Sequence, residues 1–185
     1  MSDARSIPQF PAAGAVALRF APLLPLSLAA VLLTRRLARR HPSLFSRLGD
    51  EARKVFLIDP TDLPLVFVLE PRPPRPSLSV RCRQEAVKWD ARIAGPLAAL
   101  IGLVHGAYDG DALFFSRNLT IEGDTEAIVA LRNAIDNEEL DLVSEAAALF
   151  GPLQTLVAAP ARRAAAAIGA VTGAPLTRVG TRRFE

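Results

Sequence analysis

The chain has 185 residues, enough for one domain with a full hydrophobic core. Half of its residues are hydrophobic, and its formal net charge is only +3. Its single cysteine, Cys82, excludes an internal disulfide framework and a zinc site built from several thiolates.

The N-terminal region predicts a short tail followed by an Arg-rich apolar helix. Residues 20–34 carry no charge, but this run is shorter than the roughly 20 apolar residues needed to cross a bilayer. The pattern favours a helix over residues 25–40, ended by His41 and Pro42. This helix has two open readings: packing on the domain, or contact with a membrane surface or a partner.

Period-two hydrophobic patterns predict four strands after a second short helix that opens at Pro42. The strands are expected at residues 55–58, 65–69, 77–83 and 87–93. In the third strand, Cys82 is expected to project from the same face as Leu78 and Val80, and so to be a small core residue. The last two strands are expected to pair as an antiparallel hairpin through a turn at Gln84 and Glu85.

The second half of the chain returns to helical periodicity around one more strand. One helix is expected to start at Gly95 and Pro96 and to end at His105 and Gly106, and another is expected over residues 126–140. A strand is expected at 113–121 between them, with Asp124 at the start of the second helix. An Ala-rich helical tail follows. The order predicts an α+β fold with a five-stranded, mainly antiparallel sheet covered by helices. The expected division is 1–41 (tail and Arg-rich helix), 42–140 (α+β domain) and 141–185 (C-terminal tail).

Chemistry-bearing motifs are scarce, which argues against an enzyme. The two histidines, His41 and His105, both fall at predicted helix ends, and no nucleophile elbow, dinucleotide fingerprint or phosphate loop is present. The basic segment lacks interleaved aromatic residues and the second half is acidic, which argues against nucleic-acid binding. The helices carry more apolar surface than one sheet needs, so they either pack on one another or line a cavity suited to lipid.

Two segments carry a family resemblance: FLIDPTDLPLVF at residues 56–67 and FFSRNLTIEGDT at residues 114–125. Together they resemble sterol-carrier-protein-2-like lipid-binding domains, and most of all the bacterial accessory factors of anaerobic ubiquinone biosynthesis, the UbiT group. The resemblance implies a non-catalytic protein that needs no cofactor and holds an isoprenoid or acyl chain in a hydrophobic tunnel. It also implies an isoprenoid quinone or phospholipid ligand, partners of the UbiU/UbiV iron–sulfur hydroxylase type among other ubiquinone biosynthesis proteins, and a cytoplasmic location, peripheral to the inner membrane.

On this hypothesis the lipid chain lies between inward side chains of the sheet and the covering helices. For each candidate, ordinary core packing is an equal alternative. The candidates are Phe67, Leu69, Trp89, Ile93, Leu97, Ile101, Val104, Phe115 and Leu131.

Arg117 lies among apolar neighbours of the predicted fifth strand and has two interpretations. A β-bulge would turn it to solvent. An unbroken strand would make it a contact for a phosphate or carboxylate headgroup. The rival function is a protein-interaction scaffold without a lipid cavity.

Overall fold

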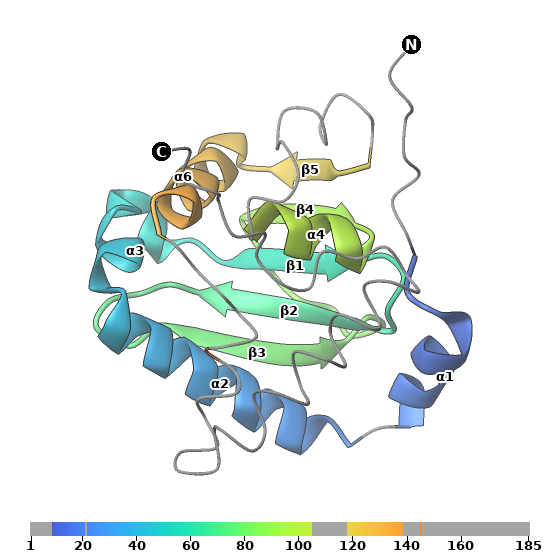
Figure 1. The fold of residues 1–185 in the computed structure, drawn as a ribbon. Helices are drawn as coiled ribbons and strands as arrows, with labels where there is room; N and C mark the ends of the chain where they lie inside the picture. Colours follow the sequence, from blue (N-terminus) through green and yellow to red (C-terminus); the bar gives the residue numbers. More distant parts are fainter. Residues whose placement is uncertain (1–8, 21, 105–117, 139–144, 146–185) are drawn as a thin grey trace, which may run out of the picture.

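The computed structural model describes residues 9–20, 22–104, 118–138 and Glu145 (Figure 1). Within these residues, four helical segments come first, then four strands, a helix, a fifth strand and a further helix. In chain order they are α1 (Ala12–Phe20), α2 (Leu23–Arg40), α3 (Pro42–Ser46), the 3₁₀ helix η1 (Gly49–Arg53), β1 (Phe56–Pro60), β2 (Leu65–Glu70), β3 (Ser77–Cys82), β4 (Ala91–Gly95), α4 (Leu97–Val104), β5 (Thr120–Gly123) and α6 (Thr125–Asp136).

The strands form one five-stranded sheet in the order β3-β2-β1-β4-β5. The pair β1–β4 is parallel and the other three pairs are antiparallel. The predicted α+β fold with a mainly antiparallel sheet is therefore confirmed.

The expected hairpin between the third and fourth strands is wrong. β3 is an edge strand, and β4 begins only at Ala91 and pairs with β1 and β5. The intervening residues include Val87 and Trp89, which pack against Leu57, Val66 and Val68. Their alternating pattern therefore comes from packing on a sheet face and not from strand pairing.

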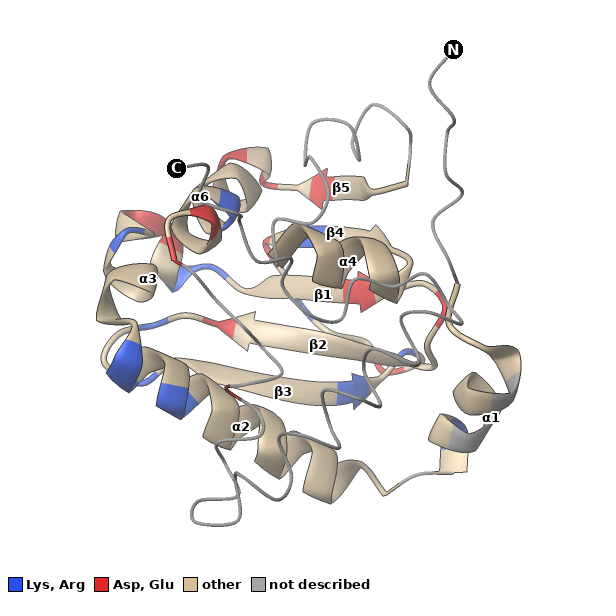
Figure 2. Ribbon diagram, viewed as in Figure 1, with Lys and Arg blue, Asp and Glu red and all other residues tan. Residues whose placement is uncertain are grey.

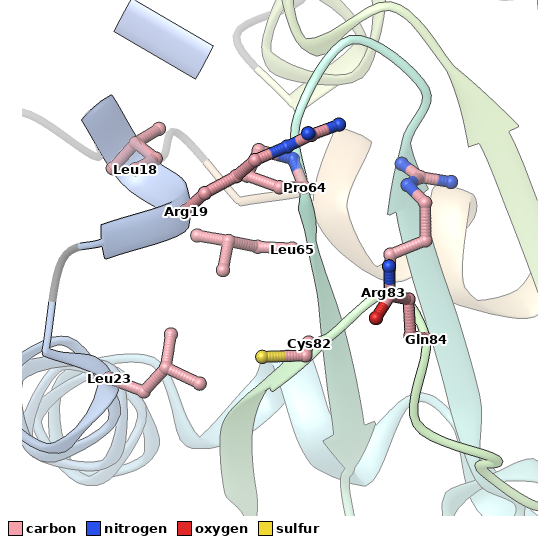
Figure 3. Close-up of a pocket in the computed structure, with 8 residues that line it drawn as sticks. All are labelled: Leu18, Arg19, Leu23, Pro64, Leu65, Cys82, Arg83 and Gln84. Carbon is pink, nitrogen blue, oxygen red and sulfur yellow. The ribbon is translucent and has the colours of Figure 1, made fainter. Parts of the chain in front are cut away.

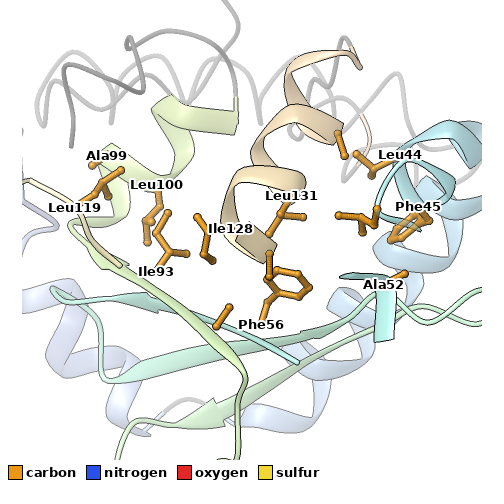
Figure 4. Close-up of a cluster of buried hydrophobic side chains, with 14 residues drawn as sticks. Leu44, Phe45, Ala52, Phe56, Ile93, Ala99, Leu100, Leu119, Ile128 and Leu131 are labelled. Carbon is orange, nitrogen blue, oxygen red and sulfur yellow. The ribbon is translucent and has the colours of Figure 1, made fainter. Parts of the chain in front are cut away.

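The helices cover one face of the sheet (Figure 1). α2 contacts β3, whereas α4 and α6 contact β4. The larger core cluster lies beneath α3, α4 and α6, with Phe56 fully buried at its base (Figure 4). A second cluster, formed by Ala30, Leu65 and Val80, lies on the same face of the sheet, between α2 and the strands β2 and β3.

The N-terminal region differs from the prediction in two ways. α2 begins at Leu23 instead of Pro25, which is tolerated because the first-turn N–H groups of a helix have no intrahelical acceptor. α1 was not expected, since prolines flank this short apolar segment. Within the described residues no single helix meets the length and hydropathy needed for a membrane span, but α1 and α2, bent by 100°, meet them as a pair.

The core placement of Cys82 is also wrong, because this residue is exposed. It faces the same way as Val80, but it is the last residue of the edge strand and lines an open cleft there. The predicted C-terminal helices, the first part of the strand at 113–121 and the end of the helix at 126–140 lie outside the described residues.

Candidate functional site

The helix-facing side of β1, β2 and β3 carries a row of apolar side chains that are only partly buried. Cross-strand pairing places Ile58 opposite Phe67, and Leu69 opposite Leu78. Residues paired in this way project from the same face of a sheet. We call these four residues the apolar row. Ile58 and Leu69 contact the larger core cluster and Phe67 and Leu78 contact the smaller one, so the row joins the two clusters.

Several predicted lipid contacts converge near this row. Ile93 and Leu131 are buried in the larger cluster, and Val104 packs against it together with Leu69. Phe67 belongs to the second cluster, whereas Leu97 and Ile101 are partly buried on α4. The structure thus gathers strand and helix candidates on one side of the sheet.

Trp89 is separated from the other candidates by the sheet itself. It packs against Leu57, Val66 and Val68, whose side chains alternate with those of the helix-facing residues. The strand predicted at 87–93 would place Trp89 and Ile93 on one face, but Trp89 precedes β4 and the two residues lie on opposite faces of the sheet. Phe115 and Arg117 lie outside the described residues, and the two interpretations of Arg117 remain predictions.

An open cleft lies where α1 and α2 approach the ends of β2 and β3 (Figure 3). Its volume is about 260 Å³. Leu18, Leu23 and Leu65 supply apolar lining, and Arg19 and Arg83 supply charge. Because Leu65 is part of the second cluster, this cleft reaches the edge of the apolar interior beneath α2.

The face opposite the helices holds a buried ion-pair cluster that was missed in the sequence. The Asp59 carboxylate, only 5% exposed, accepts from Arg92 at 2.5 Å and lies 2.5 Å from Arg83. Arg92 also pairs with Glu122 at 2.7 Å, and the hydrogen bonds that it donates to Asp59 and Glu122 raise the pKa of its guanidinium. Asp59 lies just beyond the strand predicted at residues 55–58, but it is a β1 residue. Asp59 lies two residues after Leu57, so in a strand the two side chains project from the same face of the sheet. This spacing is the feature of the sequence that predicts its position.

The turn after β1 anchors two distant segments of the chain. Asp62 accepts the backbone N–H of Leu97 at 2.9 Å and that of Phe10 at 2.8 Å. Arg83 donates to the carbonyl oxygens of Pro60 and Leu63. Side chains of the first motif thus hold the start of α4, and with it one side of the apolar row.

Comparison with protein families decides the assignment. The model of the SCP-2 sterol transfer family matches residues 34–136, from the middle of α2 to the end of α6. The chain belongs to the SCP-2 sterol transfer family. Domains of this family are lipid-binding carriers, usually without catalytic activity, so the expected class of domain is confirmed.

Solved structures of low sequence identity are similar to this chain. A structure described as a UbiJ-SCP2 ubiquinone synthesis protein is 19% identical, covers 63% of this SCP-2 family chain and 93% of its own, and has a TM-score of 0.50. Sterol carrier protein 2 from Yarrowia lipolytica in its apo form is 12% identical, with 61% and 93% covered and a TM-score of 0.43. A sterol carrier protein domain of Helicoverpa armigera is 16% identical, with 59% and 87% covered and a TM-score of 0.40. No curated protein matches the chain in sequence.

Proposed function

We propose that this SCP-2 family chain is a non-catalytic lipid-binding accessory factor of oxygen-independent ubiquinone biosynthesis. It holds an isoprenoid or acyl chain in a hydrophobic tunnel between the sheet and its helices, and presents the lipid to hydroxylases of the UbiU/UbiV type. It acts in the cytoplasm, peripheral to the inner membrane. The fold likeness to a structure described as a ubiquinone synthesis protein supports the choice of pathway.

The observation that carries this proposal is the apolar row. A filled core buries its central side chains, as it does Phe56 beneath α6. Ile58, Phe67 and Leu69 instead stay partly buried in the middle of the helix-covered face. Partly buried apolar side chains there supply the contact surface that an alkyl or isoprenoid chain requires.

Extraction of the purified protein with organic solvent, followed by mass spectrometry, tests the proposal. We expect a quinone-type lipid or phospholipid to be recovered, and uptake of added polyprenylated quinone by the lipid-free protein. Phe67→Ser removes one aromatic ring from the apolar row and should weaken uptake about tenfold or more, because burial of such a side chain contributes about 1.5–3 kcal/mol.

Trp89→Ser is the matched control, since Trp89 is also aromatic and partly buried but lies on the opposite face. It should leave uptake unchanged. Equal loss in both variants would contradict the placement of the lipid over the apolar row. Absence of both extracted lipid and uptake would reject the carrier role and favour the interaction scaffold.

A further inference from the structure

The open cleft between α1 and the ends of β2 and β3, which we call the α1 cleft, is continuous with the apolar row. Its lining includes Leu65 and Cys82, which pair across the two strands (Figure 3). The next two pairs on the same face are also apolar: Phe67 with Val80, and Leu69 with Leu78. At a rise of about 3.4 Å per residue, these pairs form a ladder about 14 Å long that leads from the cleft to the far end of the row.

The helix α1 lies over this cleft with little packing. None of its side chains that the structure describes is buried, and Val16 and Phe20 are 53% and 84% exposed. Figure 2 shows α1 almost without charge, and its one charged residue, Arg19, makes no ion pair within the described part of the chain. A second cleft, of about 440 Å³, lies between α1 and the β1–β2 turn. An element with few buried apolar contacts opens at a low cost in free energy.

The two ends of α1 are attached in different ways. At its C-terminal end, α1 meets α2 at a bend of 100°, where Pro22 has extended backbone angles, φ −64 and ψ 123. Residues at the ends of elements act as hinges, because they absorb changes in φ and ψ. At the other end, the N–H of Phe10 donates to Asp62 at 2.8 Å. In contrast, α2 is held on the sheet by the buried residues Ala30 and Thr34, so α1 is the part that can move.

We propose that the α1 cleft is the entrance through which a lipid chain reaches the apolar row, and that α1 is its movable cover. Rotation of α1 about Pro22 widens the space over Leu65 and Cys82, and the chain then passes end-on along the ladder. The occupant is an alkyl or isoprenoid chain, because every side chain of the ladder is apolar. The family match begins at residue 34, so α1 lies outside the matched residues. This inference rests on the proposed carrier role and adds the place where the lipid enters.

A cross-link between α1 and β3 tests the inference, because Cys82 is the single cysteine of the chain and lines the cleft. Leu18 lines the same cleft from α1, so Leu18→Cys supplies the second thiol. A short bis-maleimide linker with a cleavable disulfide joins the two in the full-length, lipid-free protein, and mass spectrometry verifies the intramolecular link. We expect the linked protein to lose uptake of cis-parinaric acid, a fluorescent fatty acid, and reduction of the linker to restore it.

A second link separates a fixed cover from a blocked cleft. Gln84 also lines the cleft but lies just after β3. Gln84→Cys joined to Cys82 therefore places the same linker in the cleft and leaves α1 free, so this protein should retain uptake. Equal loss of uptake with both links would overturn the role of α1, since the linker would then act by filling the cleft. Unchanged thermal midpoints of both variants before linking would verify the fold.

The thiol of the native chain gives an independent measurement. Cys82 is exposed, and alkylation of a thiol requires access to it. A chain that lies along the ladder covers Cys82, so saturation with cis-parinaric acid should slow its alkylation by N-ethylmaleimide. An unchanged rate would place the entrance elsewhere.

The outcomes for the entrance and for the carrier role are distinguishable. Uptake that the link from α1 to Cys82 leaves intact would reject the entrance alone, because the protein would still carry lipid. Absence of uptake by the unlinked protein, together with absence of extracted lipid, would reject the carrier role and the entrance with it.

Discussion

Three residues of the second resemblance motif, Glu122, Gly123 and Asp124, each have a local physical role. Gly123 adopts φ +77, a conformation that side-chain-bearing residues rarely adopt, and a Cβ there would lie 2.3 Å from the Asp90 carbonyl oxygen. Asp124 accepts the N–H of Ala127 at 3.0 Å and so caps α6. Glu122 pairs with Arg92 on the adjacent strand. The motif thus joins β5 to α6 at a close approach of two backbones.

A pair of glycine substitutions separates the two requirements at Gly123, a backbone with positive φ and the lack of space for a Cβ. Gly49 also has positive φ, at +54, but a Cβ there would meet nothing within 4 Å. Gly49→Ala should lower the free energy of unfolding by about 1 kcal/mol, from backbone strain alone. Gly123→Ala should cost about 3 kcal/mol, since it adds a steric clash with backbone. Urea unfolding measures both, and equal costs would show that the clash is relieved.

At the scale of elements, α6 is held at both ends by polar contacts. At its start, Lys54 binds Asp124 and also Glu51. Just beyond its end, Glu138 accepts from Ser43 and lies 2.8 Å from His41 Nδ1. These contacts attach α6 to the η1 and α3 regions around the larger core cluster, which includes Leu131.

These contacts predict a loss of stability in acid. The hydrogen bond from Lys54 and that from the Ala127 N–H lower the pKa of Asp124, and contacts with Ser43 and His41 lower the pKa of Glu138. Both groups therefore take up protons more readily in the unfolded chain. Their stabilisation is complete above the ordinary carboxyl pKa, about 4, and is lost as the pH falls through the lower folded-state values.

Asp124→Asn combined with Glu138→Gln should flatten the dependence of unfolding free energy on pH below about 4. Urea unfolding at a series of pH values measures the slope. Asp136→Asn, an exposed change on the same helix, alters net charge without touching Asp124 or Glu138 and supplies the reference slope. A double variant that keeps the full slope of the native chain would show that other carboxyl groups control acid unfolding.

At the scale of the whole molecule, the sheet separates two environments. The helix-facing side carries two apolar clusters joined by the apolar row. The opposite side combines a small apolar cluster with the Asp59, Arg83 and Arg92 ion pairs. One face is therefore suited to a lipid chain, and the other holds strands and turns together through charge.

Removal of bound lipid should destabilise the whole domain. A ligand that binds only the folded state adds about 2.7 kcal/mol of stability at a hundred times its dissociation constant. We expect the lipid-free protein to unfold at a lower temperature and added lipid to restore the midpoint. Differential scanning calorimetry measures both states. An identical midpoint with and without lipid would contradict occupation of the interior.

Local patterns in the sequence by themselves determined the class of fold, most elements and the family. The apolar run at residues 65–69, the alternation at 77–83, and the cap at Asp124 depend on neighbours in the chain, so they could be predicted. The sequence also indicated the apolar candidates Phe67, Leu69, Ile93 and Leu131. Its surplus of apolar helix surface left helix packing and a lipid cavity both open, and the two resemblance motifs indicated a lipid-binding class of protein.

Only the tertiary structure decided the order of the strands and which candidates share a face. The parallel pairing of β4 with β1 depends on residues far apart in the chain, and local periodicity carries no information on such pairing. Val87 and Trp89 show the alternating pattern of a strand because both pack against one face of the sheet. That face is opposite the apolar row, so Trp89 is separated from the row. The pairing of Asp59 with two arginines and the convergence of Leu18 with Leu65 and Cys82 arise in the same way. Each joins residues that only the folded chain brings together.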